Sequence, residues 1–277
     1  MSGWGQGTIN NSIGWGQGST NDIGWGSIYA DSPSGDTAIS APSFANTYSA
    51  EFDGVDQYIT TDATYSVLDG QTQASISVWV KPVSSGSSFF MVYEIGRSGG
   101  TLLNSQLVLW MYEGSRIEYN VYAGGAWCRG DITAITYDSW NHILLTFDLA
   151  QASSVNKTKI YVNGADATTG NNLNYSSFVV STTALYIGES STGKYNTFNG
   201  EMDEMAVWQG VELTSADAVT IYNSGVPTDL SEFSTPPTNW WRMGDNDSGE
   251  GTTLTDAIGS ADATLINDTA YTEDVPT

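Results

Sequence analysis

Ala74-Ser-Ile-Ser-Val-Trp-Val80 is the stretch that decides the fold class. Its aliphatic residues at positions 76, 78 and 80 alternate with two serines and Trp79. A period of two is typical of a β-strand with one buried face, because successive side chains of a strand point to opposite faces. Pro82 follows and indicates the end of the strand. The stretch therefore predicts a half-buried β-strand.

Short apolar runs of the same kind recur along the chain and are separated by turn residues. They lie at residues 89–95, 106–112, 116–122, 142–147, 159–162, 184–187 and 202–208. Asn163-Gly164 follows one of them directly and is a strong signal for a tight turn. Aromatic residues make up 12% of the 277 residues and glycine occupies 30 positions, a balance typical of strands and turns. The sequence predicts an all-β protein with one main core.

One short helix interrupts this pattern. Thr214 is a preferred N-cap residue, and Asp217 stands three residues later, as in a capping box. Gly225 and then Pro227 follow, and both favour the end of a helix. We expect a helix over residues 214–224 that forms a lid outside the core.

The net charge limits the partners of the chain. Asp and Glu number 31 against 8 Lys and Arg, which gives a formal net charge of −23. Phosphate backbones and anionic membrane surfaces repel such a chain, so we expect no nucleic acid partner. The surplus carboxylates serve either solubility in a salty medium or the recruitment of cations such as calcium.

The sequence shows neither a membrane segment nor a secretion signal. No apolar run approaches the roughly 20 residues that span a bilayer, so we expect no membrane insertion. The opening Met1-Ser-Gly-Trp4 has no charged start and no apolar core, as in chains without a secretion signal. Cys128 is the one cysteine, so no internal disulfide or thiolate metal cluster forms. His142 is the one histidine, and we expect a structural role for it.

The first 30 residues contain a repeat with a period of about ten residues. Trp4, Trp15 and Trp25 each stand between two glycines. A short glycine-rich segment cannot bury three indoles by itself, so the tryptophans need a partner surface. That surface belongs either to a larger assembly or to the protein's own folded domain. We interpret residues 1–47 as an arm and linker that anchor the protein to an assembly.

The repeat carries a resemblance to a known class of proteins. Its sequences are GWGQG, NNSIGWGQG and GWGSIYADSPSGDT, within residues 3–37. They resemble the opening segment of structural proteins of tailed bacteriophages, particularly marine ones. The resemblance implies a virion component without specifying capsid, tail or fibre.

Six further stretches occur in a characteristic order. They are AEFDGVDQYI at 50–59, SISVWVKP at 75–82, WNHILLTF at 140–147, KIYVNG at 159–164, LYIG at 185–188 and FNGEMDEMAVW at 198–208. Together they resemble the laminin G-like, or pentraxin-like, domain of the concanavalin A-like lectins and glucanases. The resemblance implies an antiparallel two-sheet jelly-roll sandwich over residues 48–230, preceded by the extended arm.

The end of the chain departs from the order of that family. NWWRMGD at 239–245 and GTTLTD at 251–256 resemble the strand and loop that usually open such a domain. We expect residues 231–277 to complete the same sandwich, because a tail of this length is marginal alone. Trp79, Trp140 and Trp208 are expected in the core between the sheets.

The resemblance also raises the question of catalysis. Glucanases of this superfamily carry the pattern Glu-x-Asp-x-x-Glu on one strand, whereas this chain reads Glu201-Met-Asp-Glu-Met-Ala206. Strand alternation would put Glu204 on the opposite face from Glu201 and Asp203, where it cannot replace the missing acid. We therefore expect no enzymatic activity.

Calcium is the cofactor that the resemblance implies, as a structural ion held by oxygen ligands. One candidate site joins the Asp53-Gly54 turn to the strand of Asp203. The alternative is the run from Asp245 through Asp247 to Glu250, whose oxygen side chains alternate within a turn but lack the full calcium-loop spacing. Turn geometry alone also explains both runs.

The family further implies a glycan site, and aromatic residues in loops are its candidates. Tyr122, Trp127 and Tyr195 are expected to stack on sugar rings, with Arg129 and Asn196 as neighbouring hydrogen-bonding residues.

These features favour a virion structural or decoration protein with a lectin-like sandwich that binds host or environmental glycans. We expect its arm to contact other virion proteins or sister subunits, and we expect a homo-oligomer. The alternative is a secreted, extracellular carbohydrate-binding module or adhesin of a bacterium. A glycoside hydrolase is the least favoured class.

Overall fold

The computed structural model describes residues 44–62, 68, 70–83, 89–98, 101–112, 116–123, 126–152, 157–169, 184–191 and 196–277. The chain divides into two compact units, Met1–Ser43 and Phe44–Thr277. Every described residue belongs to the second unit. Trp4, Trp15 and Trp25 lie outside the described residues, so the role of the arm stays a prediction.

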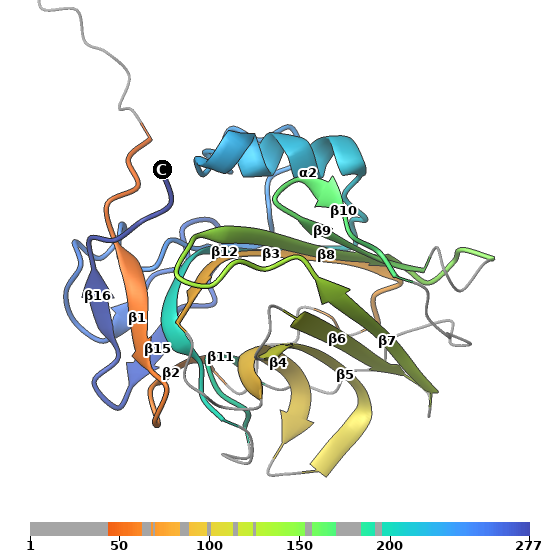
Figure 1. Cartoon of the computed structure of the whole chain (residues 1–277), viewed down its shortest axis with the longest axis horizontal. Coiled ribbons are helices and arrows are strands. Elements are labelled where there is room, and N and C mark those ends of the chain that lie inside the picture. Colours follow the sequence, from red (N-terminus) through yellow and green to blue (C-terminus); the bar gives the residue numbers. More distant parts are fainter. Residues whose placement is uncertain are drawn as a thin grey trace, which may run out of the picture. The chain divides into compact units, whose positions relative to one another are not determined.

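Two antiparallel sheets face each other in the second unit (Figure 1). Sheet A has the strand order β10-β9-β8-β3-β12-β1-β16, with β13 paired to β12. Its strands are β1 (Ser49–Asp53), β3 (Gln73–Pro82), β8 (Asn141–Asp148), β9 (Thr158–Val162), β10 (Ala165–Asp166), β12 (Asn199–Gln209), β13 (Asn239–Trp241) and β16 (Ala270–Thr272). The predicted all-β, two-sheet class is confirmed.

Sheet B has the strand order β14-β15-β2-β11-β4-β5-β6-β7. Its strands are β2 (Tyr58–Thr61), β4 (Phe89–Ser98), β5 (Thr101–Tyr112), β6 (Arg116–Ala123), β7 (Ala126–Thr133), β11 (Leu185–Ile187), β14 (Thr253–Leu254), β15 (Ala263–Ile266). Strands β4 to β7 follow one another along the chain as antiparallel neighbours, so each is joined to the next by a short connection.

The main core lies between the sheets. Alternation along β3 turns the aliphatic residues at positions 76, 78 and 80 inward, where they join one apolar cluster with residues of sheet B such as Leu107 and Leu109. Phe198 packs edge-to-face against Phe52 and Phe90, with ring centroids 5.8 and 5.6 Å apart. Close packing of this kind makes the sandwich a rigid frame for residues on its outer faces.

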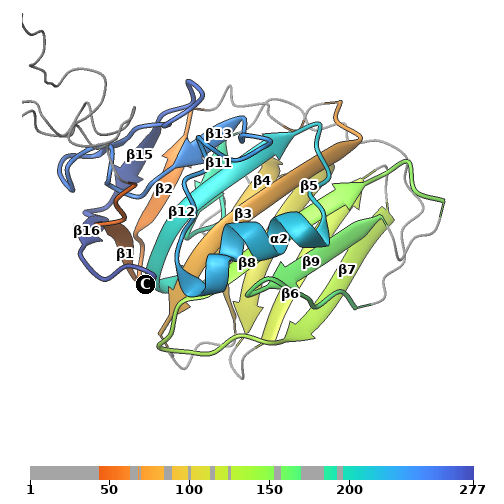
Figure 2. The ribbon, with the colours of Figure 1, turned by 90° about the horizontal axis from the view of Figure 1, so that it is seen from above.

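Helix α2 (Ser215–Tyr222) lies over the outer face of sheet A (Figures 1 and 2). The Thr214 hydroxyl accepts a hydrogen bond from the Asp217 backbone N–H, and the Asp217 carboxylate accepts one from the Thr214 N–H, so the predicted capping box is confirmed. Asn223 ends the helix in the left-handed conformation and opens the 3-10 turn η2 (Asn223–Gly225). No helix in the described part of the chain is long and apolar enough to cross a membrane.

The helix is part of a second apolar cluster, and the expectation of a lid outside the core was wrong. Ala218 and Ile221 of α2 pack with Leu144, Trp208 and Trp240 on the outer side of sheet A. The outer face of sheet A carries large apolar side chains that require cover, and the helix supplies it.

This second cluster also changes the place of the predicted core tryptophans. Trp208 belongs to the second cluster, and Trp79 stacks on Tyr222 of α2 with ring centroids 5.7 Å apart. Strand β3 is therefore buried on both faces rather than one. Trp140 is half-buried near the surface, where its Nε1 donates to Asp274 at 3.0 Å.

The C-terminal segment adds strands to both sheets. Strand β13 pairs with β12 and β16 pairs with β1 in sheet A, while β15 pairs with β2 and β14 with β15 in sheet B. Leu254, Ala263 and Leu265 from this segment lie in the main core.

Candidate functional site

A β-bulge in β12 sets the position of two acidic residues. The register between β12 and β3 shifts between Asp203 and Ala206, and Glu204 has the positive φ of 48°. After the bulge, Met205 points into the main core, so the alternation expected from the sequence does not hold here. Glu204 therefore lies on the same outer side of sheet A as Asp203, where both contact a shared cluster.

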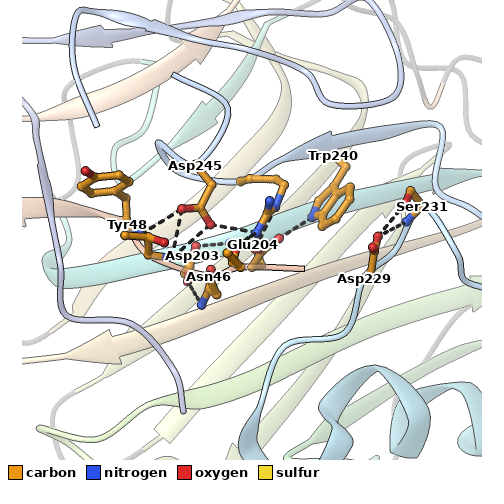
Figure 3. Close-up of polar contacts among 11 residues, drawn as sticks. Asn46, Tyr48, Asp203, Glu204, Asp229, Ser231, Trp240 and Asp245 are labelled. Atoms are coloured by element: carbon orange, nitrogen blue, oxygen red, sulfur yellow. Dashed lines mark hydrogen bonds and ion pairs between the residues drawn. The ribbon is translucent and has the colours of Figure 1, made fainter. Parts of the chain in front are cut away.

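This buried carboxylate cluster contains Asp203, Glu204, Asp245 and Arg242 (Figure 3). The Arg242 guanidinium donates to Glu204 Oε1 at 2.9 Å and to Asp245 Oδ2 at 2.8 Å. Trp240 Nε1 donates to Glu204 Oε2 at 2.6 Å. One arginine thus links carboxylates from β12 and from the turn after β13.

The same cluster fixes the residues that follow the N-terminal arm. Asn46 Nδ2 donates to Asp203 Oδ2 at 2.9 Å, and the backbone N–H groups of Thr47 and Tyr48 donate to Asp245 Oδ1 at 2.9 and 3.1 Å. The Arg242 guanidinium lies over the Phe44 ring, 4.4 Å from its centroid. The cluster therefore ties the start of the second unit to its C-terminal segment.

Burial dominates the electrostatics of the cluster. It raises the pKa of Glu204 to about 7, although Arg242 acts in the opposite direction. Burial and the neighbouring Glu204 raise the pKa of Asp203 well above its usual range. Burial also raises the pKa of Asp245, against the effect of Arg242. Three carboxyl groups share the single guanidinium of Arg242, so the cluster favours carboxyl groups that keep their protons.

The calcium ligands proposed from the sequence do not converge. Asp53 pairs with Asn199, four residues before Asp203, a separation of about 13 Å along the strand. The Asp53 carboxylate accepts from the Val55 N–H at 2.8 Å, within its own turn. Asp247 accepts from the hydroxyl and N–H of Thr255 at 2.6 and 3.0 Å.

Asp203 and Asp245 do meet, but in the arginine-linked cluster. All six carboxylate oxygens of this cluster accept hydrogen bonds from protein donors. Among the described residues, no three His, Cys, Asp or Glu side chains are grouped so as to hold a metal ion. The cluster of Asp203 and Asp245 does not fit a calcium ion, because Arg242 already supplies the positive charge there. Calcium binding by the protein stays a prediction from the family resemblance.

The cluster is also unsuited to sugar hydrolysis. Asp203 and Glu204 are 0% and 2% exposed, so a glycosidic bond cannot reach them. A retaining or inverting glycosidase needs both carboxyl groups to flank the substrate.

His142 lies in an aromatic stack beneath α2. Its ring contacts Trp79, with centroids 5.0 Å apart, and its Nε2 lies 2.7 Å from the Ser77 hydroxyl. Burial lowers the pKa of His142 to about 3, so the ring is neutral near neutral pH. These contacts fit packing rather than proton transfer.

The outer face of sheet B carries a different set of side chains. Because Ile59 and Ile187 point into the main core, the neighbouring positions Tyr58 and Tyr186 point outward. Their rings stack with centroids 5.9 Å apart, and both are half-buried. Trp110 lies on the same face of the sheet, from β5. We call Tyr58, Tyr186 and Trp110 the aromatic platform.

Polar side chains lie beside and beneath the platform. Glu118 Oε1 accepts from Trp110 Nε1 and from Asn120 Nδ2, both at 2.8 Å. Glu94 is the cross-strand partner of Tyr186 and accepts from the Ser191 hydroxyl at 2.8 Å. The bond to Glu118 fixes the orientation of the Trp110 ring. Glu94, Glu118 and Asn120 are themselves buried, so the half-buried rings are the part of this face that the apolar side of a ligand can contact.

Three of the glycan residues predicted from the sequence lie in strands rather than loops. Position 122 of β6 pairs with position 127 of β7, and position 129 pairs with Asn120. The structure therefore gives Tyr122, Trp127 and Arg129 positions on two adjacent strands of sheet B.

Of the other two predicted glycan residues, Asn196 does not join this group. Tyr195 lies outside the described residues. Asn196 is exposed, and its Nδ2 donates to the Phe89 carbonyl at the start of β4.

Sequence reasoning missed the platform itself and its carboxylates. The alternation in the runs 89–95 and 116–122 contained the signal, since polar residues alternate there with core residues. Only the register between strands shows that Glu94, Glu118 and Tyr186 share one face with Trp110.

The comparisons with known proteins agree with the fold. Residues 53–219 match the model of the concanavalin A-like lectin/glucanases superfamily. No curated protein sequence matches the chain. The heptameric SAP-like pentraxin of Limulus polyphemus is 13% identical, with a TM-score of 0.52, over 79% of this chain and 94% of the pentraxin chain.

Two further solved structures have the same fold. The sialidase-associated module CBM40 of Ruminococcus gnavus, bound to α2,3-sialyllactose, is 14% identical, with a TM-score of 0.51, over 63% of this chain and 96% of the module. The leech intramolecular trans-sialidase is 11% identical, with a TM-score of 0.51, over 67% of this chain and 29% of the enzyme.

At these identities the structural likeness shows the fold alone, whereas the family match covers more than half of the chain and confirms the resemblance seen in the sequence. The protein belongs to the concanavalin A-like lectin/glucanases superfamily.

Proposed function

We propose that this protein binds glycans without modifying them, and that the ligand lies on the outer face of sheet B. The observation that carries the proposal is the aromatic platform: the half-buried rings of Tyr58 and Tyr186 stack on each other, and the half-buried Trp110, on the same face of sheet B, is held by Glu118. Sugars present apolar C–H faces, on which aromatic rings stack. A solved neighbour of the same fold is bound to sialyllactose, which supports the class of ligand.

The absence of catalysis is part of the proposal. Asp203 and Glu204, the acids nearest to the glucanase pattern, are bound by Asn46, Trp240 and Arg242. Long incubation of the protein with oligosaccharides should release no product, with and without calcium. Cleavage under either condition would contradict this part.

A glycan array with the full-length protein tests binding. Tyr186→Ala and Trp110→Ala should each lower binding about fivefold or more, because stacking contributes on the order of 1 kcal/mol or more per ring. Val219→Ala is the matched control, since Val219 is exposed on α2 and far from sheet B in the fold. Binding that survives both sheet B substitutions would place the ligand elsewhere.

We also propose that the arm anchors the protein to a virion, through other virion proteins or sister subunits in a homo-oligomer. The glycine-framed Trp4, Trp15 and Trp25 support this proposal, because indoles in so short a segment need a partner surface. Deleting residues 1–37 should abolish incorporation into particles and leave glycan binding intact. If the protein is absent from purified particles by mass spectrometry, the extracellular adhesin is the better reading.

A further inference from the structure

We infer that the buried carboxylate cluster is a proton-operated latch, which holds the segment Phe44–Tyr48 in place at acidic pH and releases it as the pH rises. We call this segment the root, because it joins residues 1–43 to strand β1. The inference concerns a conformational change of the protein alone. It therefore depends neither on the proposed glycan binding nor on the proposed anchoring to a virion.

Four successive positions of the root, residues 45–48, form hydrogen bonds with the cluster. Arg242 donates to the backbone carbonyl at position 45, at 2.6 Å. Asp203 accepts from the Asn46 side chain at 2.9 Å, and Asp245 accepts from the two backbone N–H groups that follow, at 2.9 and 3.1 Å (Figure 3). Strand pairing of β1 begins only at the next residue along the chain. The cluster is thus the main polar attachment of the root.

Other features of the root favour local opening. Its positions 45 and 47 are exposed, and Phe44 adds a stacked contact with Trp240, with ring centroids 6.1 Å apart. Asn46 Oδ1 is buried, and none of the described residues donates a hydrogen bond to it. An unsatisfied buried acceptor is unfavourable, and water can reach this one once the root lifts. A segment with few buried contacts and no strand partner in the described part of the chain opens more easily than the sandwich.

Protons decide the charge beneath the root. With all three carboxyl groups ionised, the cluster holds three negative charges against one guanidinium, whereas protonation of Asp203 and Glu204 makes it neutral. Burial raises the pKa of Glu204 to about 7, and burial and then Glu204 raise the pKa of Asp203. Among the described residues, the charged groups that face these two acids are each other, Asp245 and Arg242. The five side chains of the root carry no charge at neutral pH.

Loss of these protons favours the open state. Lifting the root removes Asn46 from Asp203 and lets water in, which returns the pKa of the acid toward its ordinary value. The closed state therefore holds protons that the open state has lost. Closure is strongest below the ordinary pKa values of 3.8 and 4.5, and it weakens as the pH rises through the raised pKa, which is about 7 for Glu204. Between these limits, each proton released makes opening about tenfold easier per pH unit.

Hydrogen–deuterium exchange of the full-length protein over a pH series tests the latch. The amides of Thr47 and Tyr48 report on it directly, because their N–H groups donate to Asp245 in the closed state. After correction for the intrinsic effect of pH on exchange, their protection should fall about tenfold or more between about pH 5 and about pH 8. Amides of β8 should remain far more protected than the root at the upper pH, which shows that the root opens without unfolding of the sandwich.

A double variant separates the latch from a merely structural role. Asp203→Asn combined with Glu204→Gln imitates the protonated cluster, so its root should keep at the upper pH the protection that the wild type has at the lower. Asp229→Asn is the matched control, because Asp229 binds Ser231 outside the cluster (Figure 3), and it should leave the wild-type fall unchanged.

Three results would overturn the latch. One is root protection in the wild type that does not change with pH, and the wild-type series decides this even if the double variant does not fold. The second is an equal fall in the double variant, which would assign the pH effect to other groups. The third is root and β8 amides that are equally protected throughout, which would mean that the root opens only when the whole sandwich unfolds.

Discussion

At the scale of the residue, Arg242 is the cation that allows three acids to share one buried site. Its guanidinium donates to Glu204 and Asp245 and to the Ala45 carbonyl, and it packs on Phe44. Removal of one partner from a buried ion pair leaves an uncompensated charge, which costs more than the pair itself contributes. The arginine is thus expected to be a position of high sensitivity.

Arg242→Met should lower the free energy of unfolding by about 3–5 kcal/mol, since Glu204 and Asp245 lose their buried partner. Urea denaturation measures the change. The control is Lys159→Met, which breaks a more exposed pair with Glu212 at 3.3 Å and should cost less than about 1 kcal/mol. Equal losses in the two variants would contradict the role given to Arg242.

The pH dependence of stability reports on Glu204. Its pKa is raised to about 7 in the folded protein, whereas the ordinary pKa of 4.5 applies in the unfolded chain. Between these two pH values the folded state therefore holds a proton that the unfolded state has lost. The contribution of Glu204 is fully present below about pH 4.5 and is lost as the pH rises through 7. Glu204→Gln imitates the protonated form and should flatten this decline in urea titrations at several pH values. An unchanged slope would mean that Glu204 is ionised throughout.

At the scale of the element, the capping box of α2 was readable because both partners lie within four residues of each other. The burial of β3 on both faces could not be predicted from the sequence, because it depends on packing against α2, which lies more than 130 residues further along the chain. The bulge in β12 was missed for a related reason. Strand alternation is a local rule that considers neighbouring residues only. Glu204 has a left-handed backbone conformation, and its side chain binds Arg242, which lies 38 residues further along the chain.

Ile221 and Val219 provide a matched pair on this helix. Ile221 is 2% exposed in the second apolar cluster, whereas Val219 is 59% exposed. Ile221→Ala should lower the free energy of unfolding by about 2–5 kcal/mol through lost burial and a cavity. Val219→Ala should change it by less than about 0.5 kcal/mol. Chemical denaturation followed by tryptophan fluorescence measures both, and a small effect of Ile221→Ala would show that α2 only covers the sheet.

At the scale of the whole molecule, the six ordered stretches were enough to predict the family and the sandwich. The candidate site was only partly predictable. The sequence predicts Tyr122, Trp127 and Arg129 as glycan residues in loops, whereas the structure gives them positions in strands β6 and β7. The aromatic platform required the cross-strand register, because Tyr186 and Trp110 come from strands about 75 residues apart in the chain.

Truncation tests how the second unit is completed. Deleting residues 262–277 removes β15 and β16, with core residues Ala263 and Leu265, and exposes the edges of β1 and β2. The truncated protein should lose cooperative unfolding and aggregate. Deleting residues 1–43 should leave the unfolding midpoint close to that of the full chain, because the unit boundary follows Ser43. A shift of many degrees in the second variant would show that the arm is part of the folded body.

The location of the glycan on sheet B is best tested by hydrogen–deuterium exchange of the full-length protein, with and without the tightest-binding sugar from the array. Protection is expected in peptides that cover β4 to β6 and β11, and it should vanish in Tyr186→Ala. Protection confined to α2, to the buried carboxylate cluster or to other loops, with sheet B unchanged, would contradict the account.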